Sequence, residues 1–310
     1  MVKYAKILRL IWSIMLSFWL PTGHAANPLD VTNRLSSNII ARIVNAQQQA
    51  QGGKVEQAIT ILRSIKTSRP FDRAYLQRLL GIYYWQIGET IQAIEHLSDA
   101  VTSNQLTPSE QNDSSRMLAD LLALNHQYPQ ALVHYYHFVT QLKPMQSDQQ
   151  LSTWQRISQI EYQLRHWEKV LDAVSQIEQL NAPSSVTTLS IKLDAQWQLN
   201  RFNQTIVTLK QLIALQPNQS KWWFQLANAE LKKGTPQAAL STLQLAKLAG
   251  IEFSQPQLIR LAQLYAKQGI PERAARLLAS IPDQNKELIV LQANYWQQAK
   301  EWQHGRAEVC

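Results

Sequence analysis

One spacing constrains this 310-residue chain more than any other feature. A small residue recurs about every 35 positions, and a larger apolar residue follows it four positions later. The intervals between the small residues are 35, 38, 39, 35, 34 and 35. The seven pairs are Ala58/Leu62, Ala93/Leu97, Ala131/Tyr135, Val170/Val174, Thr205/Leu209, Ala239/Leu243 and Ala274/Leu278. A period near 34 residues predicts stacked helical hairpins, because each hairpin can bury its apolar side only against its neighbours.

The composition favours helices and offers no catalytic signature. Only 9 glycines occur, and Cys310 is the single cysteine, so no intramolecular disulfide or cysteine metal cluster can form. No G-x-S-x-G, phosphate-binding loop or H-E-x-x-H motif is present. The pair His134 and His137, with His126 upstream, is typical of ordinary helix histidines rather than a zinc site. We therefore expect no enzyme, no cofactor and no metal.

The first 25 residues have the order of a secretory signal. Three cations precede the apolar run Leu10–Leu20, and Gly23-His24-Ala25 fits the small-x-small cleavage rule. The run is too short to span a bilayer, which takes about 20 residues. We predict a cleaved signal peptide at 1–25, a flexible mature N-terminus at 26–38, a periplasmic location and no transmembrane span in the mature chain. An uncleaved anchor is the alternative.

The charge balance bears on the partner class. The formal net charge is +8, and removal of the leader would leave +5. A basic chain can bind nucleic acid. Here the lysines and arginines are scattered along the sequence with no basic run, so we expect no nucleic acid partner. Envelope proteins or peptide segments are the expected partners.

Two stretches carry a known pattern. Leu80-Gly81 and Tyr84, followed by Ala93, Leu97 and Ala100, spell L-G-x-x-Y and A-x-x-x-L-x-x-A, and residues 220–279 repeat this pattern regularly. From about residue 39 to 310 the chain resembles the tetratricopeptide repeat (TPR) family. The resemblance implies an all-α, right-handed superhelical solenoid of about seven hairpins plus a partial eighth. The two longer intervals predict extra residues in the links at 105–112 and 144–150.

A narrower likeness concerns the segment Trp222–Ser280. Its double tryptophan and its LAQLY run are similar to exported TPR proteins that accompany TonB energy-transduction systems of γ-proteobacteria. This likeness implies a periplasmic scaffold that assists TonB-dependent transport, with TonB-system components among its partners. The alternative is a scaffold for outer-membrane, peptidoglycan or exopolysaccharide assembly.

The family resemblance also implies which side chains line the concave, partner-binding face. These residues are Tyr75, Arg78, Trp85, Arg116, Gln159, Tyr162, Asp194, Trp197, Phe224, Asn228 and Lys232. They form a ladder rich in amides and aromatics, which suits an extended or folded polypeptide. The equally weighted alternative is that the aromatics only pack between helices. A dense Lys/Arg clamp for a terminal carboxylate is missing from this set.

The C-terminal segment predicts an incomplete repeat. A first helix is expected over about 286–299, with Trp296 packed between helices, and a second helix would begin at Trp302. We expect 300–310 to fray and the chain to be a shortened form of a longer array. Coverage of this face by another protein, or by a second copy joined through Cys310, is the alternative.

Overall fold

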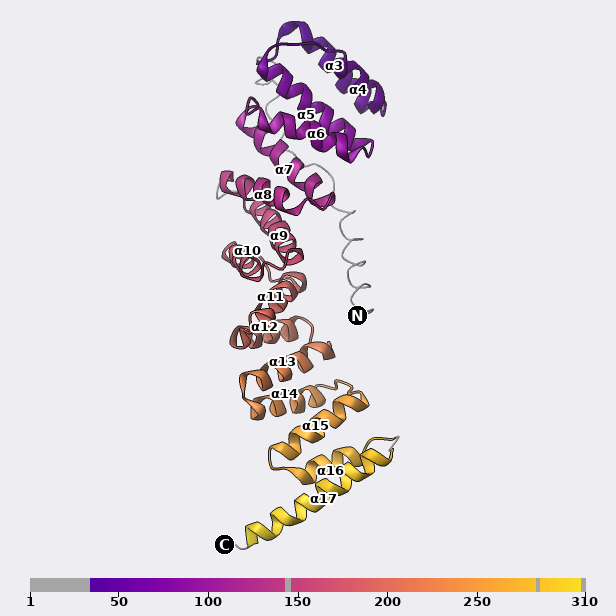
Figure 1. Cartoon of the computed structure of the whole chain (residues 1–310), viewed down its shortest axis with the longest axis vertical. Coiled ribbons are helices and arrows are strands. Elements are labelled where there is room, and N and C mark those ends of the chain that lie inside the picture. The colour runs from indigo at the N-terminus through magenta and orange to yellow at the C-terminus, as the bar shows by residue number, and fades with distance from the viewer. Residues whose placement is uncertain (1–33, 143–145, 283–284, 308–310) are drawn as a thin grey trace. The chain divides into compact units, whose positions relative to one another are not determined.

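The computed structural model describes residues 34–142, 146–282 and 285–307, and within these ranges every regular element is an α-helix (Figure 1). The predicted signal peptide, most of the predicted flexible N-terminus and residues 308–310 lie outside the described residues. The first helix begins at Ser37, and the preceding Leu35 is already buried. The predicted all-α repeat fold is confirmed.

The helices form two compact units, each described by itself. In the first unit consecutive helices pack against one another, in pairs joined by tight turns. Its helices are α3 (Ser37–Gln51), α4 (Val55–Arg63), α5 (Pro70–Gln86), α6 (Thr90–Thr102), α7 (Pro108–Leu124) and α8 (Tyr128–Gln141).

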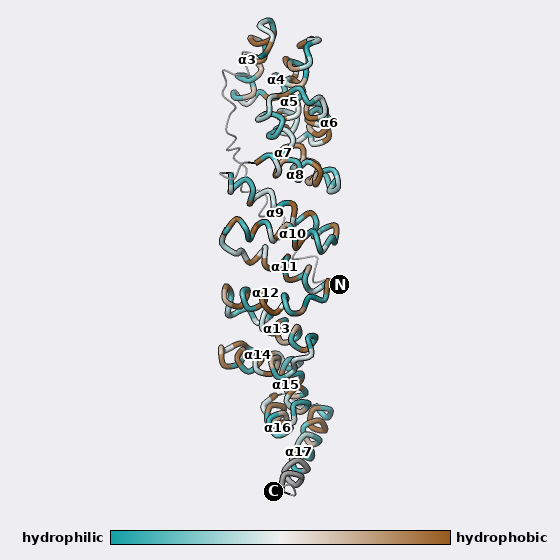
Figure 2. The backbone as a smooth tube through the Cα atoms, turned by 90° about the vertical axis from the view of Figure 1, so that its left-hand side faces the viewer, coloured by the Kyte–Doolittle hydropathy of each residue, from teal (hydrophilic) through white to brown (hydrophobic). Residues whose placement is uncertain are grey.

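The second unit continues the same arrangement, and here too each helix packs against the next. Its helices are α9 (Ser147–Gln163), α10 (Trp167–Gln179), α11 (Val186–Gln198), α12 (Phe202–Leu215), α13 (Ser220–Lys233), α14 (Pro236–Leu248), α15 (Gln255–Lys267), α16 (Pro271–Ala279) and α17 (Lys286–Ala307). Figure 2 shows hydrophobic and hydrophilic stretches alternating within the helices, as expected where only one side of each helix is buried.

The repeating small residues lie at the closest contacts of the hairpins. All seven sit on the second helix of a hairpin and are fully buried, as Ala58, Ala93, Ala131, Val170, Thr205, Ala239 and Ala274. The facing first helices carry their own small residues at several of these contacts. At Gly81 a Cβ atom would lie 2.6 Å from Leu97 Cγ, so any side chain there would force the helices apart. The recurrence of small residues about every 35 positions therefore marks where the two helices of each hairpin are in contact.

The tight turns between paired helices need a left-handed residue. Gly88 and Gly234 supply it with φ of 83° and 84°, and Asn200 and Arg165 adopt it with φ of 55° and 58°. Glycine takes this conformation without strain, whereas other residues take it less readily.

Two helix starts differ from the sequence prediction. The residues expected in links at 105–112 and 144–150 largely belong to helices, because α7 begins at Pro108 and α9 at Ser147. At α7 the cause is local. Thr107 and Glu110 form a reciprocal capping box, and Pro108 occupies the first turn, where its missing N–H costs nothing. The longer intervals thus reflect an added helical turn rather than longer loops.

The last helix also differs from the prediction. The expected break before Trp302 does not occur, since α17 runs continuously from Lys286 to Ala307. Leu288, Tyr295 and Ala299 are buried, and α17 packs against α16. Trp296 is 36% exposed and does not pack between helices as expected. A search of the described helices finds none long and apolar enough to cross a membrane.

Candidate partner-binding face

The first helices of consecutive hairpins in the second unit bring predicted binding residues together. α9 and α11 pack against each other, and the Tyr162 hydroxyl donates a hydrogen bond to Asp194 Oδ2 at 2.9 Å. Lys221, at the start of α13, lies close enough to act electrostatically on the same carboxylate. One row of side chains therefore crosses α9, α11 and α13.

The electrostatics of this row are mixed. Partial burial of the carboxylate raises the pKa of Asp194 above its ordinary value, and the Tyr162 hydrogen bond and the Lys221 charge act in the opposite direction. Asp194 as a residue remains exposed. The row therefore presents an accessible acceptor whose charge is stabilised by two neighbouring helices.

The ladder aromatics of the second unit, Tyr162, Trp197 and Phe224, are half-buried, and each contacts a second ring. Tyr162 meets Trp167 edge to face at 5.6 Å between ring centroids, and Trp197 meets Phe202 in the same way at 5.7 Å. Phe224 meets Phe253 at 4.8 Å. Each ring thus packs against a neighbouring ring and keeps part of its surface open, and binding by these side chains stays a prediction.

The remaining ladder residues of the second unit are polar and accessible. Asn228 and Lys232 on α13 are exposed, and Gln159 on α9 is half-buried. We call the combined surface the α9–α13 face. It consists of Gln159, Tyr162, Asp194, Trp197, Phe224, Asn228 and Lys232.

In the first unit one predicted binding residue is a core residue. Tyr75 is only 8% exposed and belongs to the main apolar cluster of this unit, so it offers no open surface. Its burial raises the pKa of the phenol, and a hydrogen bond with Gln47 of the preceding hairpin holds it in place. The prediction for Tyr75 was wrong, because packing against the neighbouring hairpin covers it.

The other predicted residues of the first unit are half-buried. Among the described residues, Arg78 Nε is buried without a hydrogen-bond partner. Arg116 has its guanidinium carbon 6.0 Å from the centre of the Phe138 ring and one nitrogen 4.0 Å from Asp120. Trp85 lies near the end of α5. Arg116 is thus held by its own hairpin.

Two buried polar pairs were missed from the sequence. Thr208 donates a hydrogen bond to Gln196 at 2.8 Å, and Thr242 donates one to Glu230 at 2.7 Å. In both pairs the residues are twelve positions apart and join the first helix of a hairpin to the second. Gln196 and Glu230 occupy the position where Tyr84 stands in the second hairpin, three residues after its small residue Gly81. A polar residue at this inward-facing position of the first helix could have predicted a buried polar pair from the sequence.

Burial disfavours the charged form of Glu230, the carboxylate of these two pairs. Desolvation raises the pKa of Glu230, while the Thr242 hydrogen bond and the charges of Lys210 and Lys233 lower it. A related contact occurs in the fourth hairpin, where fully buried Glu161 lies 2.7 Å from His166 Nδ1. Buried acceptors in the second unit are therefore partnered within their own hairpins.

The histidines weighed as metal ligands have structural partners. His134 Nδ1 lies 3.2 Å from Ser115 Oγ, and burial lowers the pKa of this imidazole. His126 Nδ1 lies 3.0 Å from the Tyr128 hydroxyl. Within the described residues no group of three His, Cys, Asp or Glu side chains is placed to hold a metal ion.

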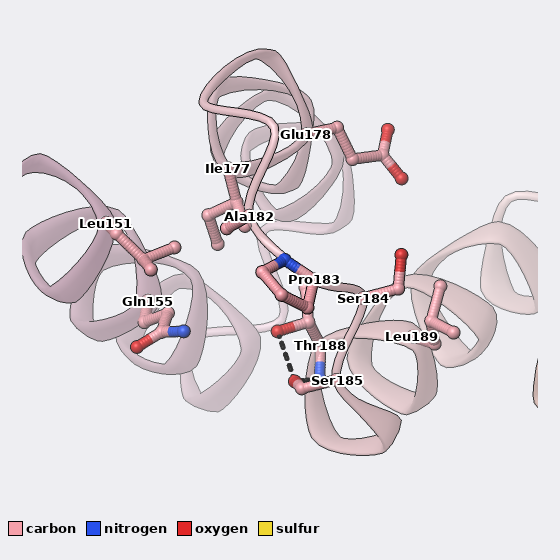
Figure 3. Close-up of a pocket in the computed structure, with 10 residues that line it drawn as sticks. All are labelled: Leu151, Gln155, Ile177, Glu178, Ala182, Pro183, Ser184, Ser185, Thr188 and Leu189. Atoms are coloured by element: carbon pink, nitrogen blue, oxygen red, sulfur yellow. Dashed lines mark hydrogen bonds between the residues drawn. The ribbon is translucent and has the colours of Figure 1, made fainter. Parts of the chain in front are cut away.

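A small depression lies between α9 and α11 near the α10–α11 loop (Figure 3). Its rim includes Leu151, Gln155 and Pro183, and Thr188 N donates a hydrogen bond to Ser185 Oγ at 3.0 Å. The enclosed volume of about 20 Å³ is room for about one water molecule. The depression is therefore unsuited to a small-molecule ligand.

No family model and no curated protein matches the chain. Among solved structures it is similar to a tetratricopeptide repeat protein from Parabacteroides merdae, with 14% identity over 84% of this chain and 100% of that one and a TM-score of 0.44. The C-terminal part of a TPR repeat-containing protein from Cytophaga hutchinsonii gives 14% identity, coverages of 80% and 98%, and a TM-score of 0.43. MamA from Desulfovibrio magneticus is 15% identical over 58% of this chain and 96% of that one, with a TM-score of 0.41. Likenesses this distant carry no argument about function.

Proposed function

We propose that this protein is a non-catalytic TPR scaffold that binds a polypeptide partner on the α9–α13 face. The observation that carries the proposal is the row formed by Tyr162, Asp194 and Lys221 across three consecutive hairpins. A continuous strip of exposed amide, carboxylate and ammonium groups beside half-buried rings can hydrogen-bond and pack against an extended chain.

The cellular setting of the scaffold is a second part of the proposal. The charge, apolar run and cleavage site of residues 1–25 support export and cleavage, hence a periplasmic location. The likeness of Trp222–Ser280 to exported TPR proteins supports assistance to a TonB-dependent transport system, with TonB-system components as envelope partners. A scaffold for outer-membrane, peptidoglycan or exopolysaccharide assembly is the competing proposal.

Site-specific photo-crosslinking tests the binding face. A photoreactive residue replaces Gln159 or Asn228 on the face, and matched variants carry it at the exposed positions Ser241 and Leu248 on α14. Crosslinking is carried out in the native host, and the adducts are identified by mass spectrometry. We expect a discrete protein adduct from the two face positions and none from the two α14 positions.

The same experiment separates the alternatives. TonB-system proteins in the adduct would support the transport role, and envelope-assembly enzymes would support the competing role. Adducts from α14 alone would overturn the assignment of the face. N-terminal sequencing of the exported protein should give Ala26 as the first residue, whereas a start at Met1 would contradict cleavage.

A further inference from the structure

The positive charge of the protein is concentrated in two adjacent hairpins. Residues 220–279, which form α13–α16, contain eight Lys and Arg but only three Asp and Glu, for a net charge of +5. The chain after residue 25 also carries a net +5, so the rest of it is balanced. The net positive charge therefore lies in this region, whereas the lysines and arginines elsewhere after residue 25 are balanced by acidic residues.

Half of these cations gather at one end of the two hairpins. Lys232 and Lys233 end α13, Lys267 ends α15, and Arg273 lies in the first turn of α16. Because consecutive first helices run in the same direction, the α13/α14 and α15/α16 turns lie on the same side of the stack, at the left in Figure 1. We call these four residues the basic turn edge, and all four are exposed.

The charges of this edge have one acidic neighbour in the described chain, since the Lys233 charge acts on the buried Glu230 carboxylate and lowers its pKa. No ion pair joins any of its four residues to an acidic side chain in that part of the protein. The preceding turn is different, because Arg201 there contacts both carboxylate oxygens of Glu168, at 2.7 and 2.8 Å.

Helix stability explains only part of the edge. Cations at the C-terminal ends of α13 and α15 interact favourably with the helix dipoles. Arg273 lies instead in the first turn of α16, where the dipole disfavours a cation. Nearby Glu272 is paired with Arg276 at 2.5 Å. Arg273 thus adds charge to the edge at a local cost, with no described contact to compensate for it.

We infer that the basic turn edge docks an acidic polypeptide segment in extended form. This inference rests on the proposed scaffold function and adds the partner's chemistry. An extended segment exposes all of its side chains, so several of its carboxylates can meet the four exposed cations of the two turns in one binding event.

Nucleic acid fits the surroundings less well. Single strands bind where aromatic rings are free for base stacking. Two rings of this region are already engaged, since Phe224 contacts Phe253 and the Tyr265 hydroxyl near the end of α15 accepts a hydrogen bond from Gln244 at 3.0 Å. An acidic polypeptide needs only the cations and backbone donors that the edge offers.

The test measures binding of fluorescent oligoglutamate to the full mature chain by anisotropy at low ionic strength. The edge variant is Lys233→Gln/Lys267→Gln/Arg273→Gln, which leaves the shared residue Lys232 intact. The matched control is Lys54→Gln/Lys66→Gln/Arg73→Gln, three exposed cations of the first unit. We expect the edge variant to lose about tenfold in affinity, equivalent to about 1.4 kcal/mol, and the control to lose less than about threefold.

Each other outcome contradicts the inference. Equal losses in both variants would show that net charge alone attracts the probe. Tighter edge-dependent binding of a single-stranded oligonucleotide, or of anionic phospholipid vesicles, would replace the acidic polypeptide by that partner. Circular dichroism checks that both variants stay folded. Loss of crosslinking at Gln159 and Asn228 with retained oligoglutamate binding would instead count against the proposed face alone.

Discussion

The hairpins α11/α12 and α13/α14 are neighbours built to the same plan, and they differ in their buried acceptor and in the pairing of the charges at their turns. Both begin their first helix 19 residues before the buried small residue of the second helix, which is Thr205 or Ala239, and both join their helices by a buried hydrogen bond from a threonine. The acceptor is neutral Gln196 in one hairpin and ionisable Glu230 in the other. The α11/α12 turn has an ion-paired cation in Arg201, whereas among the described residues no ion pair includes Lys232 or Lys233 at the α13/α14 turn.

The comparison separates two tasks within one repeat. The buried contacts that hold paired helices together are repeated with little change, so they maintain the fold. The exposed charges change from one hairpin to the next, so they are free to serve recognition. Variants that alter one hairpin to resemble the other can therefore break or sharpen this division.

The largest expected effect is overpacking of the α13/α14 contact. Ala239 is fully buried, and Ala239→Leu inserts a larger side chain where the helices are closest. We expect a loss of about 1–3 kcal/mol in the free energy of unfolding, measured by urea denaturation. Thr205→Ala, at the equivalent place in α12, should cost less because it adds no volume. An equal loss of stability in the two variants would show that the added volume of leucine is not the cause.

Removing the threonine donors should come next in size. Thr242→Val leaves the buried Glu230 carboxylate without its donor, and Thr208→Val does the same to the neutral amide of Gln196. An unsatisfied buried group costs about 1–3 kcal/mol, and a charged one costs more. The unfolding midpoint in urea should therefore fall further for Thr242→Val near neutral pH. A larger loss for Thr208→Val would contradict the role given to the charge.

The seven hairpins could be predicted from the sequence because close helix contacts accept only small side chains at a fixed spacing. The buried pair Glu230 and Thr242 was missed, since residues twelve apart across a turn do not appear in a helical periodicity. The start of α7 could have been found from Thr107, Pro108 and Glu110. The burial of Tyr75 depends on a neighbouring hairpin, which a single repeat does not reveal.

A smaller effect is expected from neutralising Glu230. Its pKa is raised in the folded protein, so the folded state favours the protonated form, and this stability is lost as the pH rises through the folded pKa. Glu230→Gln should therefore stabilise the protein above that pKa. The gain should vanish below the ordinary glutamate pKa of about 4.3. Thermal unfolding followed across this range tests the sign, and a gain confined to acid would be inconsistent with it.

The smallest expected effect concerns the accessible Tyr162 hydroxyl. Tyr162→Phe removes its hydrogen bond to Asp194, and an exposed bond of this kind contributes about 0.5–1.5 kcal/mol at most. The same bond lowers the pKa of Asp194, so that pKa should rise in the variant. Carboxyl titration by NMR would detect the change. An unaltered pKa would mean that the row across α9 and α11 is not formed in solution.

The central claim is that buried contacts hold the hairpins while exposed charges carry binding. Its most direct test measures the urea midpoint and the oligoglutamate affinity on the same samples of Lys233→Gln/Lys267→Gln/Arg273→Gln and of Glu230→Gln. The account predicts that the first variant loses about tenfold in affinity with only the small fall in urea midpoint expected from the lost helix-dipole contacts, and that the second changes its pH-dependent stability with little change in affinity. A triple variant that unfolds more easily yet binds oligoglutamate as tightly as the parent protein would contradict the claim.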